Sequence, residues 1–174
     1  MYFYKFNISN IDKCTKIIND IIKNIRPEDE TTCSYKSTQK GTQYNLNNSI
    51  NYLHDIIFCI EECIKSCLNC SVKLESIWTI IGEHGTYHTI HRHSKYIDKV
   101  SVVLYLQVPS EQVFPEGSIY FFDDNADNYS KSIKIVTPKI GDLIIFPSSI
   151  FHGTYPQGRG TRQTLNVDFS IKGA

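Results

Sequence analysis

The stretch TPKIGDLIIFPSSIFHGTYPQGRGTRQTLNVDF, residues 137–169, contains two segments of the kind that form β-strands. The first, residues 142–147, is a mostly apolar run that follows a turn with Pro and Gly. The second begins at residue 163, continues to 171, and is rich in β-branched and aromatic side chains. Short runs of this composition between turn residues predict strands. His152 lies between them, and Arg162 follows ten residues later on the second strand.

Four more segments of the same kind precede this stretch. They are VKLESIWTII (residues 72–81), KVSVVLYLQV (99–108), GSIYFFD (117–123) and SIKIVT (132–137). Gly, Pro, Asn and Asp separate them, as expected for the turns between strands. Six short strands in succession predict an antiparallel β-sandwich or barrel.

The N-terminal third shows a helical period instead. Ser9 is the predicted N-cap of a first helix, and Pro27 ends it. A second helix is predicted from about Ser49 to Cys70, after a polar stretch that reads as a long loop. We therefore expect a mainly β (α+β) fold, a jelly roll or double-stranded β-helix with two N-terminal helices packed on one sheet. A single domain is expected over residues 1–174, with a helical part (1–70) and a jelly-roll core (71–174).

The composition limits the classes of partner. Of the 174 residues, 18 are Lys or Arg and 18 are Asp or Glu, so there is no net charge to attract nucleic acid. No apolar run approaches the roughly 18 residues of a membrane span, and the N-terminus lacks a signal-peptide pattern. The sequence thus predicts a cytoplasmic protein that acts neither on nucleic acid nor at a membrane, and we expect a monomer or homodimer.

Four cysteines follow one another along the second predicted helix: Cys59, Cys63, Cys67 and Cys70. The last three have the C-x3-C-x2-C spacing of iron–sulfur sites in radical S-adenosylmethionine enzymes, but those cysteines lie in a loop of a long α/β barrel. One helix cannot place tetrahedral ligands around a metal. We therefore interpret the four as small apolar residues at the edge of the core, without disulfides.

Three of the six histidines lie within HTIHRHSKY, residues 88–96. His91 and His93 are two residues apart, so in an extended strand both point to one face while Arg92 points away. This arrangement suits two ligands of one metal. A solvated or buried structural role explains the pair equally well, so the pair alone leaves both interpretations open.

The two regions together form a longer pattern. Gly85-x5-His91-x-His93 is followed by a strand with Tyr105-Leu106, by P-x-x-G-D-L-x-x-F-P-S-x-x-x-H-G over residues 138–153, and by R-x-T at 162–164. From about residue 78 to residue 169, the sequence resembles the 2-oxoglutarate- and Fe(II)-dependent oxygenases. It is most similar to the small phage-type and bacterial members related to prolyl hydroxylases.

The resemblance implies a role for each matching residue. His91 and His152 correspond to two histidine ligands of Fe(II). Arg162 corresponds to the arginine that binds the distal carboxylate of 2-oxoglutarate, with help from Tyr105 and Thr164. Arg159, in the QGRG turn, is a weaker candidate for that arginine.

One position departs from the family motif H-x-D, because this chain has His93 in place of the aspartate. In the favoured interpretation His93 is itself a ligand, since phage-type relatives carry a histidine there. In a second interpretation Asp98 supplies the carboxylate, and in a third the site is incomplete and the protein only binds. His84 and His88 are expected outside the ligand set, near it or at the surface.

The implied activity is hydroxylation of a C–H bond in a peptidyl residue or an amino-acid-like substrate, so the implied partner is a peptide or a small molecule. Fe(II), 2-oxoglutarate and O2 are the implied cofactors, and succinate and CO2 are the implied products. Two other functions stay open. Gly85-x5-His91-x-His93-x4-Asp98 also resembles the first motif of the cupins, which implies a metal protein or a three-histidine dioxygenase that does not use 2-oxoglutarate. A non-catalytic jelly-roll binding module is the last alternative.

Overall fold

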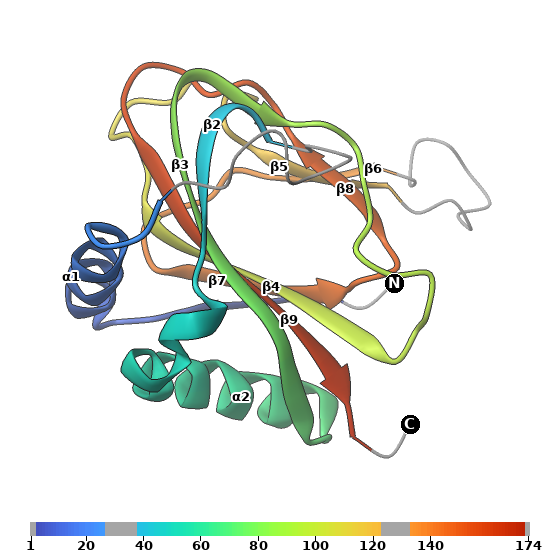
Figure 1. Cartoon of the computed structure of the whole chain (residues 1–174). Helices are drawn as coiled ribbons and strands as arrows, with labels where there is room; N and C mark the ends of the chain where they lie inside the picture. Colours follow the sequence, from blue (N-terminus) through green and yellow to red (C-terminus); the bar gives the residue numbers. More distant parts are fainter. Residues whose placement is uncertain (1–2, 27–37, 123–132, 173–174) are drawn as a thin grey trace.

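The computed structural model describes residues 3–26, 38–122 and 133–172, and in them two antiparallel sheets face each other (Figure 1). The larger sheet has the strand order β1-β7-β4-β9-β3-β2, and the smaller has the order β6-β5-β8. This arrangement is the predicted mainly β jelly roll. The strands are β1 (Tyr4–Asn7), β2 (Thr38–Asn45), β3 (Val72–His88), β4 (Lys99–Gln107), β5 (Ile119–Phe122), β6 (Ile133–Val136), β7 (Asp142–Pro147), β8 (Phe151–Thr154) and β9 (Arg162–Ile171).

Two α-helices cover the outer face of the larger sheet (Figure 1), as the sequence predicts. These are α1 (Ile11–Ile22) and α2 (His54–Leu68). Ile18 from α1 and Ile60 from α2 are buried in one core with Leu104 of β4 and Leu165 of β9. Removal of this apolar surface from water is the main force that holds the helices on the sheet.

The opposite face of the larger sheet looks toward the smaller sheet. Because alternate residues of a strand point to opposite faces, β9 sends Leu165, Val167 and Phe169 toward the helices. The residues between them point into the space between the sheets. A second core closes part of that space, and polar side chains line the rest. The members of this second core are Val103, Tyr105, Ile119, Phe121, Ile144 and Phe146.

Several predicted boundaries are wrong. Asn10, not Ser9, precedes α1, and it makes no side-chain cap hydrogen bond. A 3₁₀-helix, η1 (Asn47–Tyr52), precedes α2, so the second α-helix is shorter than predicted. The predicted long loop contains β2, whose Gln, Gly and Asn residues give no apolar alternation. The short strands β1 and β8 are also absent from the sequence-based prediction. The rest of that loop, residues 27–37, lies outside the described residues.

Three of the four cysteines in and just after α2 pack against the core. Cys63, Cys67 and Cys70 pack partly buried against the helix-side core, as expected, whereas Cys59 is exposed. Burial raises the pKa of the Cys63 thiol to about 11, so this thiol stays protonated and unreactive near neutral pH. All described cysteines are free thiols.

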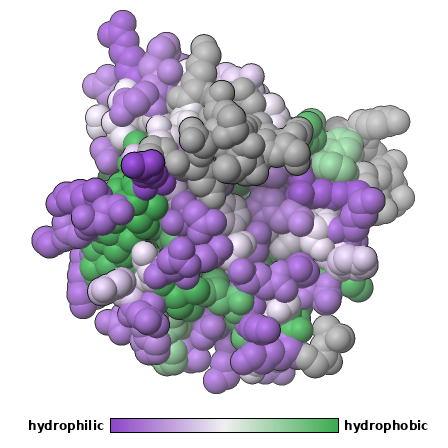
Figure 2. Space-filling view, in the orientation of Figure 1, coloured by the Kyte–Doolittle hydropathy of each residue, from purple (hydrophilic) through white to green (hydrophobic). Residues whose placement is uncertain are grey.

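The outer surface is mostly polar in the view of Figure 2, with apolar surface showing between polar side chains on the side of α1. Among the described helices, none is long and apolar enough to cross a membrane.

Candidate metal centre

A cavity of about 350 Å³ lies between the two sheets. His152 enters it from β8, and His91 and His93 enter it from the segment that follows β3. An isolated bridge joins these two segments. The N–H of His91 donates to the carbonyl of His152, and the N–H of His152 donates to the carbonyl of His91, each at 2.9 Å. Backbone pairing therefore brings histidines that are far apart in the sequence to one place.

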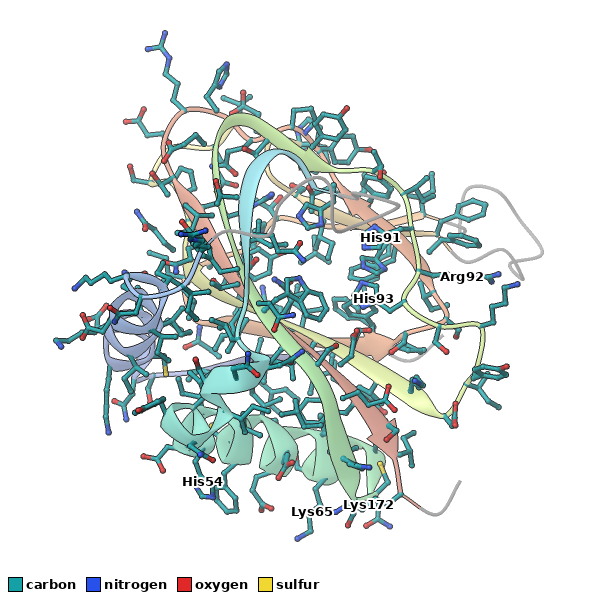
Figure 3. The ribbon with its side chains drawn as sticks, viewed as in Figure 1. His54, Lys65, His91, Arg92, His93 and Lys172 are labelled. Carbon is teal, nitrogen blue, oxygen red and sulfur yellow. The ribbon has the colours of Figure 1, made fainter. Side chains whose placement is uncertain are left out.

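The three imidazoles converge in this cavity. One ligand atom from each ring lies within 4.8 Å of the others. The Nε2 atoms of His91 and His93 are 3.1 Å apart. Figure 3 shows these two side chains one above the other, with Arg92 pointing away from the cavity. The predicted alternation, with both histidines on one face and Arg92 on the other, is confirmed.

Two of the rings are fixed by backbone carbonyls through the nitrogen that faces away from the centre. Nδ1 of His91 lies 2.7 Å from the carbonyl oxygen of Thr89, and Nδ1 of His152 lies 3.1 Å from that of Ile150. A carbonyl oxygen can only accept a hydrogen bond, so each Nδ1 carries the proton and donates it. Nε2 of each ring is then the unprotonated nitrogen, which is the usual state of a metal-binding histidine.

The third ring is fixed by a carboxylate. Nδ1 of His93 donates to Oδ1 of Asp168 at 2.8 Å, and the hydroxyl of Ser101 donates to the same oxygen at 2.7 Å. Both side chains of the His93–Asp168 pair are less than one-fifth exposed. The Nδ1 of His93 therefore carries a proton, and its Nε2 faces the centre.

Electrostatics makes this arrangement a site for a cation. Three nitrogen lone pairs that face one another repel unless a positive ion lies among them. Burial lowers the pKa of His91, and it lowers the pKa of His152 well below the usual value, with His93 adding to both shifts. Protons therefore compete poorly for these rings near neutral pH. Neighbouring ligands of an octahedral metal, at bond lengths of about 2.1 Å, lie roughly 3 Å apart, and the spacing between His91 and His93 fits this value.

The structure places the alternative ligand Asp98 outside this group. Asp98 lies in the turn before β4, does not line the cavity, and is absent from the described set of converging ligand atoms. Its carbonyl accepts the N–H of Ile171, and its Oδ1 is buried without a hydrogen-bond partner in the described part of the chain. Within that part, the carboxylate that contacts the histidines is Asp168.

Arg162 lines the same cavity and is only 3% exposed. Its Nη1 donates to the carbonyl of Gly117 at 3.0 Å, and no Asp or Glu in the described ranges forms an ion pair with it. Burial lowers the pKa of Arg162, although the guanidinium stays charged at neutral pH. A buried cation without a counter-ion is costly, so this group suits an anionic ligand.

The two residues predicted to assist Arg162 lie beside it. Tyr105 and Thr164 are directly opposite each other on β4 and β9, and both line the cavity. Burial raises the pKa of Tyr105, so its hydroxyl is neutral and can donate a hydrogen bond. The structure therefore brings all three predicted 2-oxoglutarate contacts to one wall.

The remaining candidates lie as the sequence indicates. His88 lines the cavity, and its backbone N–H donates to Oγ1 of Thr154 at 2.8 Å. His84 is exposed on β3. Arg159 is exposed in the loop before β9, so it is not placed to bind a ligand in the cavity.

The sequence profile of the family described as "Putative 2OG-Fe(II) oxygenase" matches residues 76–168, which is more than half of the chain. The chain belongs to this oxygenase family. No curated protein matches the sequence.

Solved structures of other 2-oxoglutarate- and Fe(II)-dependent oxygenases share the fold. The viral collagen prolyl hydroxylase vCPH from Paramecium bursaria Chlorella virus-1, as a 2-oxoglutarate complex, has a TM-score of 0.67 and 18% identity, over 98% of this chain and 97% of that one. A Pseudomonas putida prolyl-4-hydroxylase has a TM-score of 0.66 and 17% identity, over 98% and 92%. HygX from Streptomyces hygroscopicus, with nickel and 2-oxoglutarate bound, has a TM-score of 0.68 and 11% identity, over 98% and 83%.

Family membership makes the protein an oxygenase that uses Fe(II), 2-oxoglutarate and O2. The residues of the cavity fit these groups. The converging histidines are of the type that binds iron, and the buried guanidinium, which has no acidic partner among the residues that the structure describes, is of the type that binds a carboxylate.

Several residues of this oxygenase site are absent from the sequence-based prediction, and one of them, Asp168, contacts a histidine directly. A usable signal is present on β9: Arg162, Thr164, Asn166 and Asp168 occupy alternate positions, and all four line the cavity. A strand with a polar residue at every second position and apolar residues between predicts that its polar face lines a site. No local signal marks Trp78, which lines the cavity, or Ser101, which contacts Asp168, because both depend on the pairing of β3 and β4 with β9.

Proposed function

We propose that the protein is a hydroxylase of a C–H bond in a peptidyl residue or amino-acid-like substrate, with succinate and CO2 as co-products. One observation carries this proposal. Three histidines turn ring nitrogens toward one another, in the same cavity as a buried arginine that has no acidic partner in the described residues. Imidazole nitrogens bind Fe(II) and a buried arginine binds a carboxylate, so this combination of groups suits Fe(II) together with 2-oxoglutarate.

The roles follow from the contacts. His91, His93 and His152 hold Fe(II) through Nε2, and Thr89, Asp168 and Ile150 hold the rings in place.

Arg162 binds the distal carboxylate of 2-oxoglutarate, and the hydroxyls of Tyr105 and Thr164 donate to it. Bound Fe(II) and 2-oxoglutarate together supply the chemistry that activates O2 for insertion into a C–H bond. The protein orients the substrate, and the apolar side chains of the second core limit the access of water to the cavity.

The class of substrate is supported by the walls of the cavity and by the fold. Gln43, Asn45 and Asn166 line the cavity together with Trp78, so amide and aromatic groups are available to a peptide or amino-acid-like ligand. Proteins of similar fold include prolyl hydroxylases, one of them from Trichoplax adhaerens in complex with a peptide fragment of a hypoxia-inducible factor. Its structure has a TM-score of 0.70 and 13% identity, over 97% of this chain and 83% of that one.

The test is an anaerobic titration of Fe(II) and then 2-oxoglutarate, monitored by the weak visible charge-transfer band of the chelate. The wild-type protein should give the band. His152→Ala should lose iron binding and the band together, whereas Arg162→Ala should keep iron and lose affinity for 2-oxoglutarate. Arg159→Ala is the matched control, since that arginine is exposed outside the cavity and should bind normally.

Three outcomes would contradict the proposal. Wild-type affinity for 2-oxoglutarate in Arg162→Ala would remove the assigned anchor. Bound iron without any chelate band would favour the second candidate function, a three-histidine dioxygenase that does not use 2-oxoglutarate. The all-histidine ligand set is the observation that keeps that candidate in view. If the protein bound no divalent metal at all, the non-catalytic binding module would replace both.

Three expectations from the sequence stay predictions: the single domain over residues 1–174, the monomeric or dimeric state, and the cytoplasmic location. The predicted absence of nucleic acid as a substrate also stays a prediction, based on the balanced charge of the chain.

A further inference from the structure

We propose that Asp168 is a positioning residue that supplies, through His93, the negative charge that the H-x-D motif would provide at the metal itself. The inference rests on the proposed function, because it requires His93 to be a ligand. It concerns a residue that the family pattern does not assign and that the ligand set alone does not reveal.

The contacts of Asp168 are directed at His93. Its Oδ1 accepts from Nδ1 of His93 at 2.8 Å and from the hydroxyl of Ser101 at 2.7 Å. Its Oδ2 accepts from the hydroxyl of Ser76 at 3.4 Å. Within the described residues, His93 is the one ion-pair partner of this carboxylate. Asp168 is therefore held in place by hydroxyls and directs its charge at the ring of His93.

The surrounding strands fix this geometry. Asp168 is paired with Ser101 of β4 on one side and with Ser76 of β3 on the other. The backbone N–H of His93 donates to the carbonyl of Ser148 at 3.0 Å, and the hydroxyls of Ser101 and Ser148 are 2.8 Å apart. Both the backbone and the ring of His93 are thus attached to the rigid sheet, which preorganises Nε2 toward the other two histidines.

Asp168 is not itself placed to be a ligand. It contacts Nδ1 of His93, whereas the site is formed on the Nε2 side of the ring. The carboxylate and the metal would therefore lie on opposite edges of one imidazole. This is the carboxylate–histidine–metal arrangement, in which the outer acid fixes the tautomer and strengthens the ring as a donor.

Charge balance explains why such an acid is needed here. Two histidines and one carboxylate offset one positive charge of Fe(II), whereas three neutral histidines offset none. A buried dication with only neutral ligands is costly in a medium of low dielectric constant. Asp168, which contacts the far side of the His93 ring, returns to the cavity the one negative charge that is lost when His93 replaces the aspartate of the H-x-D motif.

The first experiment compares Asp168→Asn with the wild type by anaerobic Fe(II) titration against a chelating indicator. Asparagine keeps the size of the side chain and removes its charge. We expect Fe(II) affinity to fall by about 10- to 100-fold, as for other outer partners of metal-binding histidines. The charge-transfer band of the 2-oxoglutarate complex should also move to shorter wavelength, because a weaker histidine donor lowers the energy of the iron electrons. A purely structural role would not move this band.

Asp142→Asn is the matched control for stability. Asp142 is also a buried carboxylate of the larger sheet, on β7, where it accepts the backbone N–H of Lys139 and pairs with Lys5, away from the histidines. Its substitution should change the melting temperature of the metal-free protein without changing Fe(II) affinity or the band.

A double variant tests the charge exchange directly. His93→Asp restores the H-x-D motif but leaves Asp168 buried without its partner and close to the new carboxylate, so Fe(II) binding should be weak. Adding Asp168→Asn removes that second negative charge. We expect His93→Asp/Asp168→Asn to bind Fe(II) at least tenfold more tightly than His93→Asp alone.

The outcomes distinguish the role of Asp168 from the proposed function. If the wild type binds Fe(II) and 2-oxoglutarate but Asp168→Asn matches it in affinity and band position, the role of Asp168 is wrong and the proposed function stands. The role of Asp168 is equally wrong if the double variant binds Fe(II) no better than His93→Asp. If the wild type fails to bind Fe(II), the proposed function itself is wrong.

Discussion

The two faces of β9 differ in chemistry from Thr164 onward, although they alternate residue by residue. The face toward the helices carries one polar residue, Gln163, which donates to Asn19 of α1, and then Leu165, Val167 and Phe169, all fully buried in the helix-side core. The face toward the smaller sheet carries the polar residues that line the cavity: Arg162, Thr164, Asn166 and Asp168. One strand therefore serves the stability of the fold on one side and the binding site on the other.

This difference teaches how a small domain can hold costly polar groups in place. The apolar face fixes the strand on the helices, so the polar face can keep a guanidinium and a carboxylate buried without rearranging. The two faces should respond to substitution in opposite ways, with loss of stability on one side and loss of binding on the other.

The largest effect on stability is expected from Leu165→Ala on the apolar face. Leu165 is fully buried among helix and sheet residues, so truncation leaves a cavity and should lower the free energy of unfolding by about 2–5 kcal/mol. Urea unfolding of the metal-free protein measures this. The fraction that stays folded should bind Fe(II) and 2-oxoglutarate with wild-type affinity, and a specific loss of ligand affinity would show that the faces are not independent.

Arg162→Met on the polar face should have the opposite effects: stability is kept or raised, and ligand binding is lost. Methionine fills much of the space of the arginine and removes a buried charge without an acidic partner among the described residues. Replacing a buried charge by an apolar side chain is commonly neutral or stabilising by about 1–4 kcal/mol. Thermal unfolding without ligands should therefore show an unchanged or raised melting temperature, while 2-oxoglutarate binding is lost. A clearly lower melting temperature would mean that Arg162 also holds the fold together.

The apolar face is also the part that sequence alone predicts well. The alternation in residues 163–171 and the apolar run in 142–147 predict β9 and β7 nearly to the residue, because burial imposes a simple period. The strand β2 escapes prediction, since its residues are polar and its strand conformation comes from pairing with β3. Tertiary pairing overrides local preference in such a segment.

The cavity that the polar face lines is only partly predictable. His91, His93, His152 and Arg162 are found through the family pattern, and the structure brings them into one cavity. Asp168 is missed because its partner His93 lies on a distant segment, and only the pairing of the strands together with the His93–Ser148 backbone bond brings the two together. Contacts that depend on strand register have no signature in a single local stretch of sequence.

The cavity that the polar face lines should also make the metal-free protein sensitive to acid. Burial keeps the pKa of His152 well below its value in the unfolded chain, which is about 6.5. Below that pH the unfolded chain binds a proton that the folded chain does not, so stability falls by up to about 1.4 kcal/mol per pH unit for this residue. Urea unfolding at pH 7.5 and 5.5 measures the loss, and His152→Gln should reduce it. His54→Gln, at an exposed histidine, should not, and equal losses in all three proteins would contradict the prediction.

The smallest effect is expected from Thr164→Val, which tests how sharply the two faces are divided. Thr164 lies on the polar face next to the apolar Leu165, and its hydroxyl accepts the side-chain N–H of Asn166 at 3.1 Å. Valine has nearly the same shape, so packing should be kept while one hydrogen bond to 2-oxoglutarate and one to Asn166 are lost. A single neutral hydrogen bond contributes about 0.5–1.5 kcal/mol, so affinity for 2-oxoglutarate should fall roughly two- to twelvefold, with little change in melting temperature. If instead affinity for 2-oxoglutarate stayed constant and the melting temperature fell, the Thr164 hydroxyl would stabilise β9 without binding the ligand. Of the two residues, only Arg162 would then bind 2-oxoglutarate.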